Sequence, residues 1–303
     1  NQTFDPQISG GTGFSKIIIQ SGNVRNQGIE LALGYRNTWR DFTWDTNYTL
    51  STNQNKIISL ANNVINYATG ERFSIDRLNM GGLGDAQFLL QEGGTLGDLY
   101  SRRDLRYDEN NAIYIDENGN VATETIQDVN KYVKLGSVLP DVNMSWRNDF
   151  RWRNFNFGFL LTARLGGVVY SRTQAVMDYY GVSASSADAR DAGGIVINGN
   201  DLIDAQKWYQ TVANGDTTPQ YYTYSATNVR LQEASIGYTI PRKKLGDVCD
   251  ITLSIVGRNL WMLYNKAPFD PEAVATTSNY YQGIDYFMMP SLRSIGFNVR
   301  VKF

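Results

Sequence analysis

The chain has 303 residues, a formal net charge of −2 at pH 7 and no histidine. The balanced charge argues against nucleic acid as a partner, because binding phosphates requires a concentrated basic surface. A Ser-His-Asp triad and a histidine-ligated zinc are excluded, and the single cysteine, Cys249, has no second cysteine to pair with. Tyrosine, phenylalanine and glycine are abundant, as in β-rich proteins. No apolar run approaches the roughly 20 residues of a membrane helix.

Four stretches alternate apolar and polar residues with a period of two: 28–37, 41–51, 141–152 and 154–166. In the first stretch Ile29, Leu31 and Leu33 fall on one face, with Glu30 and the following even-numbered residues on the other. A helix would mix these faces, so the pattern predicts four strands with one apolar face each.

The other predicted strands are less regular. Residues 86–107 suggest a hairpin that turns at Gly93–Gly94, and residues 171–194 suggest a short helix inside a loop. Residues 229–240 change phase near Gln232–Glu233, which indicates a bulge. Residues 251–264 alternate up to Gly257, and 294–303 alternate to the end of the sequence. The total is about nine strands, many of roughly 10–12 residues where ordinary strands have about 5–6.

The connections between these strands differ at the two ends. Short links lie at 37–41, 151–154 and 241–250, and long links at 55–82, 107–140, 170–225 and 265–290. Long strands with short turns on one side and long loops on the other are typical of an outer-membrane barrel. We therefore expect an all-β fold, a transmembrane antiparallel up-and-down β-barrel with long extracellular loops. A soluble β-sandwich shows the same alternation and stays open as an alternative.

Aromatic residues gather near the short turns, as in the interfacial girdle of a barrel, although ordinary packing on a sheet surface also explains them. They are Tyr35, Trp39, Phe42, Trp44, Phe150, Trp152, Phe155 and Tyr238.

Five blocks of sequence carry a resemblance to a known family: 23–37, 116–120, 228–241, 256–272 and 281–303. In this order the blocks resemble the C-terminal part of SusC/RagA-type TonB-dependent outer-membrane transporters. The resemblance implies a ~22-stranded barrel closed by a plug. Residues 1–303 would form its C-terminal portion, with the plug, the TonB box and the N-terminal strands absent from this chain.

The resemblance further implies an active nutrient importer in the Gram-negative outer membrane, taking up oligosaccharides or peptides. Its partners would be a SusD-like surface lipoprotein acting as a lid, TonB as the energy source, the remaining barrel and plug, and the lipid bilayer. Neither enzymatic activity nor a cofactor or metal is expected. Phe303 would be part of the barrel-assembly signal. A passive porin and a soluble glycan-binding module remain alternative functions.

Ligand contacts are expected on the long-loop side, where aromatic rings can stack on sugars or peptides and hydrogen-bond with their polar tips. Packing within the loops, or against a partner protein, explains the same rings equally well. The candidates are Tyr179, Tyr180, Trp208, Tyr209, Tyr221, Tyr222, Tyr224, Tyr280, Tyr281 and Tyr286.

Two acidic pairs, Asp116/Glu117 and Asp270/Glu272, have the composition of glycosidase carboxylates, but no predicted cleft joins them. We interpret them as turn and loop residues. The segment 116–120 also resembles part of a calcium loop, but it lacks the regular ligand spacing and the distal glutamate of an EF-hand.

Overall fold

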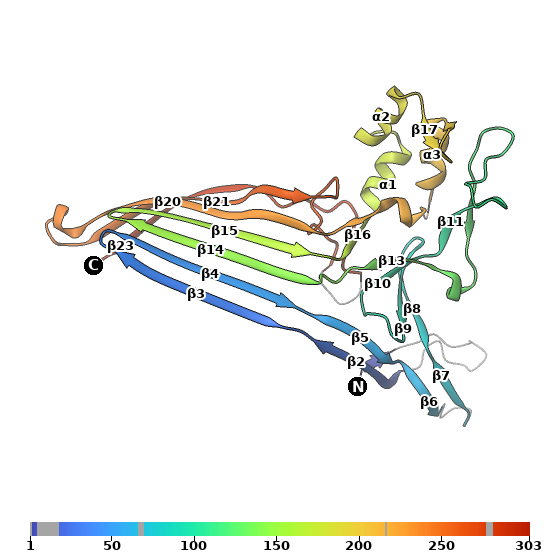
Figure 1. Cartoon of the computed structure of the whole chain (residues 1–303), viewed down its shortest axis with the longest axis horizontal. Coiled ribbons are helices and arrows are strands. Elements are labelled where there is room, and N and C mark those ends of the chain that lie inside the picture. Colours follow the sequence, from blue (N-terminus) through green and yellow to red (C-terminus); the bar gives the residue numbers. More distant parts are fainter. Residues whose placement is uncertain (1, 5–17, 66–69, 216, 277–280) are drawn as a thin grey trace.

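A seven-stranded antiparallel sheet dominates the computed structural model, which describes residues 2–4, 18–65, 70–215, 217–276 and 281–303 (Figure 1). The strands of this sheet, which we call the barrel sheet, are β3 (Glu30–Trp39), β4 (Phe42–Thr52), β14 (Val142–Trp152), β15 (Phe155–Leu165), β20 (Asn228–Ile240), β21 (Asp250–Asn265) and β23 (Ser294–Lys302). Each strand pairs with the next of these strands along the chain. The predicted up-and-down topology is confirmed.

One end of the barrel sheet has tight connections. Arg40 and Arg153 adopt left-handed conformations (φ 54° and 52°) in the β3–β4 and β14–β15 turns, and η4 (Arg242–Lys244) lies between β20 and β21. The segments 53–141, 166–227 and 266–293 emerge from the opposite end, and Figure 1 shows their elements gathered there. We call this end the loop region. The asymmetry predicted from the sequence is therefore present.

The register aligns like residues across the barrel sheet. One row of paired residues is apolar in six successive strands: Trp44, Phe150, Phe157, Ile236, Ile255 and Phe297. The next row contains Arg36, Asp45 and Asp149 followed by Gly158 and Ser235. Adjacent residues point to opposite faces, so the sheet has one apolar and one polar face. In a membrane barrel the apolar face is the outer one.

The predicted aromatic residues form a continuous belt at the tight-turn end of the apolar face. Trp39 stacks on Phe42, Phe42 on Phe150, and Trp44 on Phe150, with ring centroids 6.0–6.4 Å apart. Phe155 contacts Tyr238 edge to face at 5.0 Å. This is the arrangement expected of rings at a membrane interface.

The β3–β4 hairpin continues into the loop region as β2 (Ile19–Gln27) paired with β5 (Gln54–Ser59), and β1 (Gln2–Phe4) pairs with β2. Gly28 joins β2 to β3 beside Thr52, where a Cβ would overlap the Thr52 carbonyl oxygen. Only glycine allows the two backbones to approach this closely.

In its described residues the loop region contains short strands, three α-helices and two 3-10 helices. Its N-terminal strands are β6 (Ala61–Ile65), β7 (Arg72–Ile75), β8 (Arg77–Leu83), β9 (Ala86–Gln91), β10 (Asp98–Ser101), β11 (Arg103–Leu105), β12 (Thr123–Thr125) and β13 (Val133–Ser137), with η2 (Val129–Lys131) before the last. The second half comprises β16 (Val168–Ser171), α1 (Arg172–Tyr179), α2 (Ala184–Asp191), β17 (Ile195–Ile197), β18 (Asp201–Ile203), α3 (Ala205–Val212), η3 (Pro219–Tyr222), β19 (Thr223–Ser225) and β22 (Ile284–Asp285).

Two sequence expectations are refined here. The hairpin predicted at 86–107 forms as β9–β10 around Gly93 (φ 84°), but it belongs to a separate four-stranded sheet, β13-β10-β9-β8. Of the roughly nine strands expected for the barrel, seven therefore lie in the barrel sheet. The predicted helix within 171–194 is present as two helices, α1 and α2.

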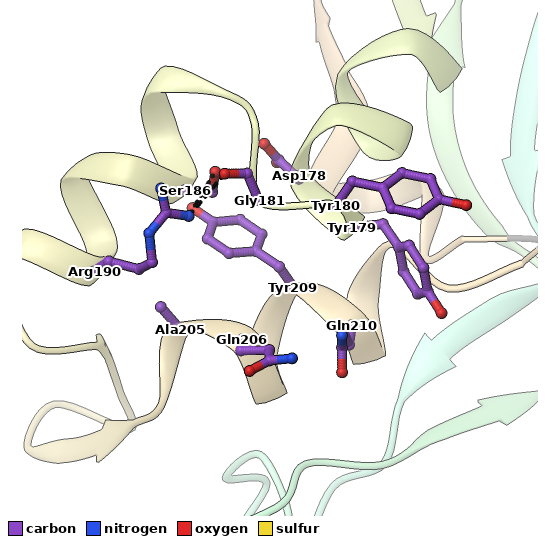
Figure 2. A pocket seen from close by; sticks show the side chains of 10 residues that line it. All are labelled: Asp178, Tyr179, Tyr180, Gly181, Ser186, Arg190, Ala205, Gln206, Tyr209 and Gln210. Carbon is purple, nitrogen blue, oxygen red and sulfur yellow. Dashed lines mark hydrogen bonds between the residues drawn. The ribbon is translucent and has the colours of Figure 1, made fainter.

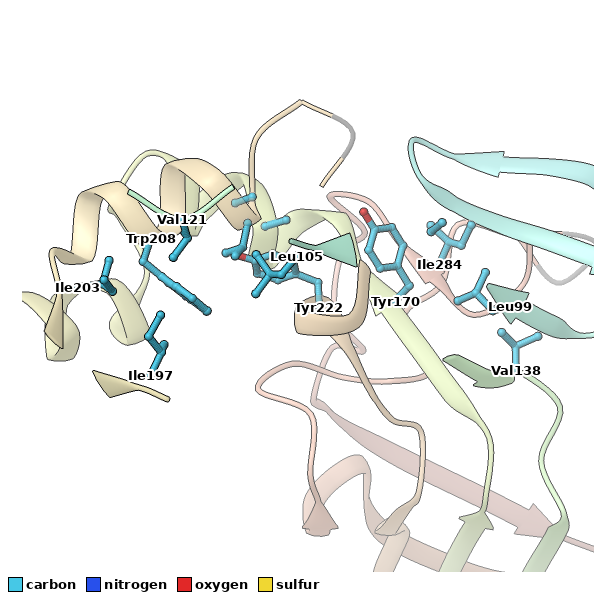
Figure 3. Packing of buried hydrophobic residues seen from close by; sticks show 14 of the residues in the cluster. Leu99, Leu105, Val121, Val138, Tyr170, Ile197, Ile203, Trp208, Tyr222 and Ile284 are labelled. Atoms are coloured by element: carbon cyan, nitrogen blue, oxygen red, sulfur yellow. The ribbon is translucent and has the colours of Figure 1, made fainter. Parts of the chain in front are cut away.

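The hydrophobic core lies in the loop region and not in the barrel sheet (Figure 3). The largest buried cluster includes Phe88, Leu99, Tyr170, Trp208 and Tyr222. A soluble sandwich requires a second sheet packed on the apolar face. In the described part of the chain Phe157, Ile255 and Phe297 are 46–70% exposed, so no such layer covers them.

Among the described residues, no helix combines the length and the apolar character that crossing a membrane would require.

Candidate ligand-binding surface

Ion pairs between charged residues lie across the polar face of the barrel sheet, and we call this set the ion-pair belt. Arg147 donates to Asp149 (Nε–Oδ2, 2.8 Å) and also contacts Glu233 (Nη1–Oε1, 3.6 Å). Arg258 contacts the same Glu233 (Nε–Oε2, 3.2 Å), and Arg36 lies 4.0 Å from Asp45, the residue paired with Asp149. These partly exposed pairs contribute little to stability. They make this face hydrophilic, as the wall of a water-filled lumen requires.

A buried ion cluster joins two of the family-like blocks at the border of the loop region. Arg230, 4% exposed, donates from Nη2 to Asp270 Oδ1 (2.8 Å) and contacts Glu272 Oε2 (3.2 Å). Asp270 Oδ2 accepts from the Ser291 hydroxyl at 2.6 Å. Burial alone would raise the pKa of Asp270, but the hydrogen bonds from Arg230 and Ser291 outweigh it and hold that pKa below its usual value. The pair Asp270/Glu272 therefore anchors a loop.

Asp116 closes a hairpin turn with its own side chain. Its Oδ1 accepts from the backbone N–H groups of Asn118 (2.9 Å) and Asn120 (2.8 Å). The Asn120 amide, backbone first and then side chain, holds the pKa of Asp116 below its ordinary value. Asp108 makes the same contacts eight positions earlier, to the N–H groups of Asn110 and Ala112. Both segments are turns.

Four of the predicted aromatic residues pack in the core of the loop region or against other rings there, and Tyr221 among them stays 38% exposed. Trp208 (6% exposed) and Tyr222 (2%) belong to the core, and Trp208 meets Tyr221 edge to face at 5.3 Å. Tyr224 meets Phe269 in the same way at 5.6 Å. Burial raises the pKa of Tyr221 and of Tyr224 to about 12, so both phenols stay protonated at neutral pH. The rings of Trp208 and Tyr222 offer no surface to a ligand in this conformation.

Three other predicted tyrosines meet in one pocket (Figure 2). Tyr179 and Tyr180 stand at the C-terminal end of α1, and Tyr209 lies on α3. The cavity has a volume of about 330 Å³. Its remaining lining residues are Asp178, Gly181, Ser186, Arg190, Ala205, Gln206 and Gln210. We call this cavity the helix pocket.

The last predicted residues are spread over separate places. Tyr281 contacts Phe88 edge to face at 5.8 Å and donates from its hydroxyl to the Met80 carbonyl (3.2 Å). Tyr286 is 49% exposed beside Phe287, Phe303 is 85% exposed after the end of β23, and Tyr280 lies outside the described residues.

Helix α3 was not predicted from the sequence, and the two glutamines that it contributes to the helix pocket were therefore not among the candidate residues. A signal was present, because Asp204 accepts from the Lys207 N–H as an N-cap and apolar residues follow at 205, 208, 209 and 212. Arg190 and Gln206 carry no local sequence signal, since only the packing of α2 against α3 brings them together.

These features define a class of fold: a segment of a membrane β-barrel with a hydrophilic inner face and a packed loop region on one side. Solved structures agree, because the RagAB peptide importer in its closed-closed state superposes with a TM-score of 0.69 over 99% of this chain, at 14% sequence identity. The matched region is 32% of that chain. The open-open state gives the same TM-score at 13% identity. The all-β barrel fold predicted from the sequence is thus confirmed.

The chain is similar in sequence to TonB-dependent receptors. It is 26% identical to TonB-dependent receptor P3 of Formosa agariphila over 96% of its length, and 25% identical to TonB-dependent receptor SusC of Bacteroides thetaiotaomicron over 92%. The resemblance inferred from the five sequence blocks is confirmed. The chain spans 30% of the first relative and 26% of the second. A scan against protein-family models finds no match.

Proposed function

We propose that residues 1–303 form the C-terminal barrel portion of an active nutrient importer of the SusC type in the Gram-negative outer membrane. The observation that carries the proposal is the barrel sheet itself, with an apolar face on one side and the ion-pair belt on the other. Exposed apolar strands are stable next to lipid, and a charged inner wall is stable next to water.

The similarity to TonB-dependent receptors supports active transport. In this proposal the plug and the segment that contacts TonB belong to parts of the protein outside this chain. Substrate would be captured on the loop side, and the plug would rearrange when TonB supplies energy. The substrate would be an oligosaccharide or a peptide, because the helix pocket in the loop region is lined largely by aromatic and amide groups.

A SusD-like surface lipoprotein is the partner that we propose for the loop region. Apolar side chains protrude there from short elements, including Val196 and Leu202, which pair across the β17–β18 hairpin and are 61% and 60% exposed. Apolar side chains that are this exposed are suited to an interface in which a partner protein covers them and excludes water.

Uptake in cells tests the proposal. The full-length gene in a Gram-negative host should support growth on, or accumulation of, an oligosaccharide or peptide substrate, and deletion of tonB should abolish this uptake. A passive porin, the second candidate, would give the same uptake without TonB. Solubility of the full-length protein in detergent-free buffer as a monomer would contradict both membrane functions.

We also propose that Phe303 is part of the signal read during barrel assembly. Replacing Phe303 with serine should reduce the amount of folded protein in the outer membrane several-fold, with unchanged uptake per folded molecule. Lys302→Ser in the neighbouring position, on the opposite face, serves as the control. A normal yield of folded Phe303→Ser protein would contradict this role.

A further inference from the structure

The helix pocket lies apart from the buried ion cluster and from the barrel wall, and it is a defined cavity with aromatic and polar walls. We propose that it binds one neutral sugar unit of an oligosaccharide. This inference rests on the proposed import function and deepens it, because it selects one of the two substrate classes.

The walls of the pocket are fixed before any ligand arrives. Asp178, 4% exposed, accepts from Gln174 Nε2 (2.9 Å), from Ser185 Oγ (2.9 Å) and from the Ser183 hydroxyl. Ser183 in turn caps α2 by accepting from the Ser186 N–H at 3.0 Å. These bonds lock the turn between α1 and α2, which carries Tyr179 and Tyr180. A preorganised site loses less entropy on binding.

A second bond closes the same turn from α2. Arg190 Nη1 donates to the Gly181 carbonyl at 2.8 Å. Gly181 adopts φ 69°, and a Cβ there would stand 3.0 Å from this Nη1, so both the conformation and the space favour glycine. Arg190 therefore holds the wall of the pocket through one nitrogen while its side chain stays largely exposed.

The lining matches the two kinds of surface that a sugar presents. The rings of Tyr179 and Tyr180 meet edge to face at 5.1 Å, and Tyr180 is 72% exposed at the rim. An exposed ring can stack on the C–H face of a sugar. Gln206 and Gln210 on α3 also line the pocket (Figure 2), and each carboxamide can both donate to and accept from hydroxyl groups.

Tyr209 adds a hydroxyl donor inside the pocket, with its ring between α2 and α3 (Figure 2). Burial first, and then the negative charge of Asp178, raise its pKa, so the phenol remains protonated at neutral pH. The volume of about 330 Å³ is at the lower end of the roughly 300–1,000 Å³ typical of ligand pockets, which fits a single sugar unit with its neighbours outside.

The secondary structure of the walls, and the hydrogen bonds already made by the lining carboxylate, favour a sugar over a peptide. The one acidic side chain among the lining residues, Asp178, is buried and already accepts three hydrogen bonds through Oδ1, so it does not serve a peptide ammonium group. Extended peptides commonly pair with a strand edge. The walls of this pocket are helices and a turn.

Binding to the purified full-length transporter in detergent tests the inference. The probes are neutral hexasaccharides of α- and β-linked glucan, xylan, mannan and galactan, with a tryptic digest of casein as the peptide probe, and titration calorimetry is the readout. At least one hexasaccharide should bind. The variant Gln206→Ala/Gln210→Ala should weaken its binding at least tenfold, and Tyr180→Ala should weaken it several-fold. All three side chains are exposed, so folding is not at risk.

Gln54→Ala on β5, another exposed glutamine, is the matched control and should bind as the wild type does. Failure of every hexasaccharide to bind, unchanged affinity in the glutamine variant, or weakened binding of casein peptides instead would each overturn the sugar assignment. The import function is judged separately. If uptake depends on TonB but the pocket variants bind hexasaccharides as well as the wild type does, only the pocket proposal is contradicted. If uptake does not depend on TonB but the pocket variants lose hexasaccharide binding, only the import function is contradicted.

Discussion

Asn148 lies on the apolar face of the barrel sheet, yet its side chain is almost completely buried there (1% exposed). Trp44 covers it and donates from Nε1 to Asn148 Oδ1 at 3.0 Å, and Trp146 donates in the same way to Thr46 at 3.0 Å. Two indole N–H groups thus donate to polar side-chain oxygens on the face that we assign to lipid, while the buried Asn148 Nδ2 has no hydrogen-bond partner in the described part of the chain. An uncovered amide in hydrocarbon would cost several kcal/mol.

Replacing Trp44 with phenylalanine should destabilise the full-length barrel by about 1–3 kcal/mol, because Asn148 Oδ1 loses its donor in a dry environment. Adding Asn148→Leu to this variant should restore at least most of the loss, since it removes the orphaned Oδ1 together with Nδ2, which has no partner in the described wild-type structure. Urea unfolding in detergent micelles measures both effects. Trp152→Phe, a 56% exposed indole at the same end of the sheet, is the control. No recovery in the double variant would show that packing of the indole ring dominates.

Asp270 links protonation to the stability of the loop region. The pKa of Asp270 is lower in the folded protein than the ordinary value of about 3.9. The carboxylate therefore contributes its full share to the free energy of unfolding above about pH 4, and this contribution is lost as the pH falls through the folded pKa. At pH 7, Asp270→Asn should cost about 3 kcal/mol, the loss typical of removing one partner from a buried ion pair.

Thermal unfolding of wild type and Asp270→Asn between pH 3 and pH 7 checks this prediction. The difference in Tm should be constant at neutral pH and should shrink below about pH 4. Glu109→Gln, at an exposed turn position, should show no such difference at any pH. A difference in Tm between Asp270→Asn and wild type that stays constant down to pH 3 would contradict a role for the carboxylate charge.

Among the elements, those with a period of two over about ten residues were predictable, because the alternation itself reports the two environments of a strand. The bulge at Gln232 was equally visible, and the structure skips this residue in pairing Leu231 and Glu233 with both neighbouring strands. The hairpin β9–β10 was recognised, but its sheet was not, since nothing local distinguishes a strand that pairs with β8 and β13 from one in the barrel. The helix pocket depends on contacts between segments 179–190 and 205–210, which only the tertiary fold brings together.

Gly28 tests the junction between β2 and β3. Gly28→Ala should lower the temperature at which the folded band is lost on unboiled SDS gels, because the new Cβ would overlap the Thr52 backbone and one strand must move. Gly34→Ala in β3 is the matched control, since its Cβ would stand 3.0 Å from the movable side-chain oxygen of Asn47. Equal losses in the two variants would mean that strand entropy, and not the close approach at Gly28, sets the cost.

At the scale of the molecule, the barrel sheet is a single layer, so its stability depends on the lipid next to its apolar face and on the strands that pair with its edges. The buried apolar clusters of the described part lie in the loop region. The two outer strands of the barrel sheet, β3 and β23, each pair on one side only within the described residues. Backbone groups without partners are not tolerated in hydrocarbon. We therefore expect both edges to pair with strands from outside this segment.

Hydrogen–deuterium exchange on the full-length protein in detergent measures this closure directly. Amides of β3 and β23 should exchange as slowly as those of the central strands β14 and β15, because barrel closure pairs every strand on both sides. In the isolated segment 1–303 the same edge amides should exchange much faster than β14 and β15, which keep both neighbours. Fast exchange confined to β3 and β23 in the full-length protein would mean that the sheet stays open, and the assignment of its apolar face to lipid would fail with it.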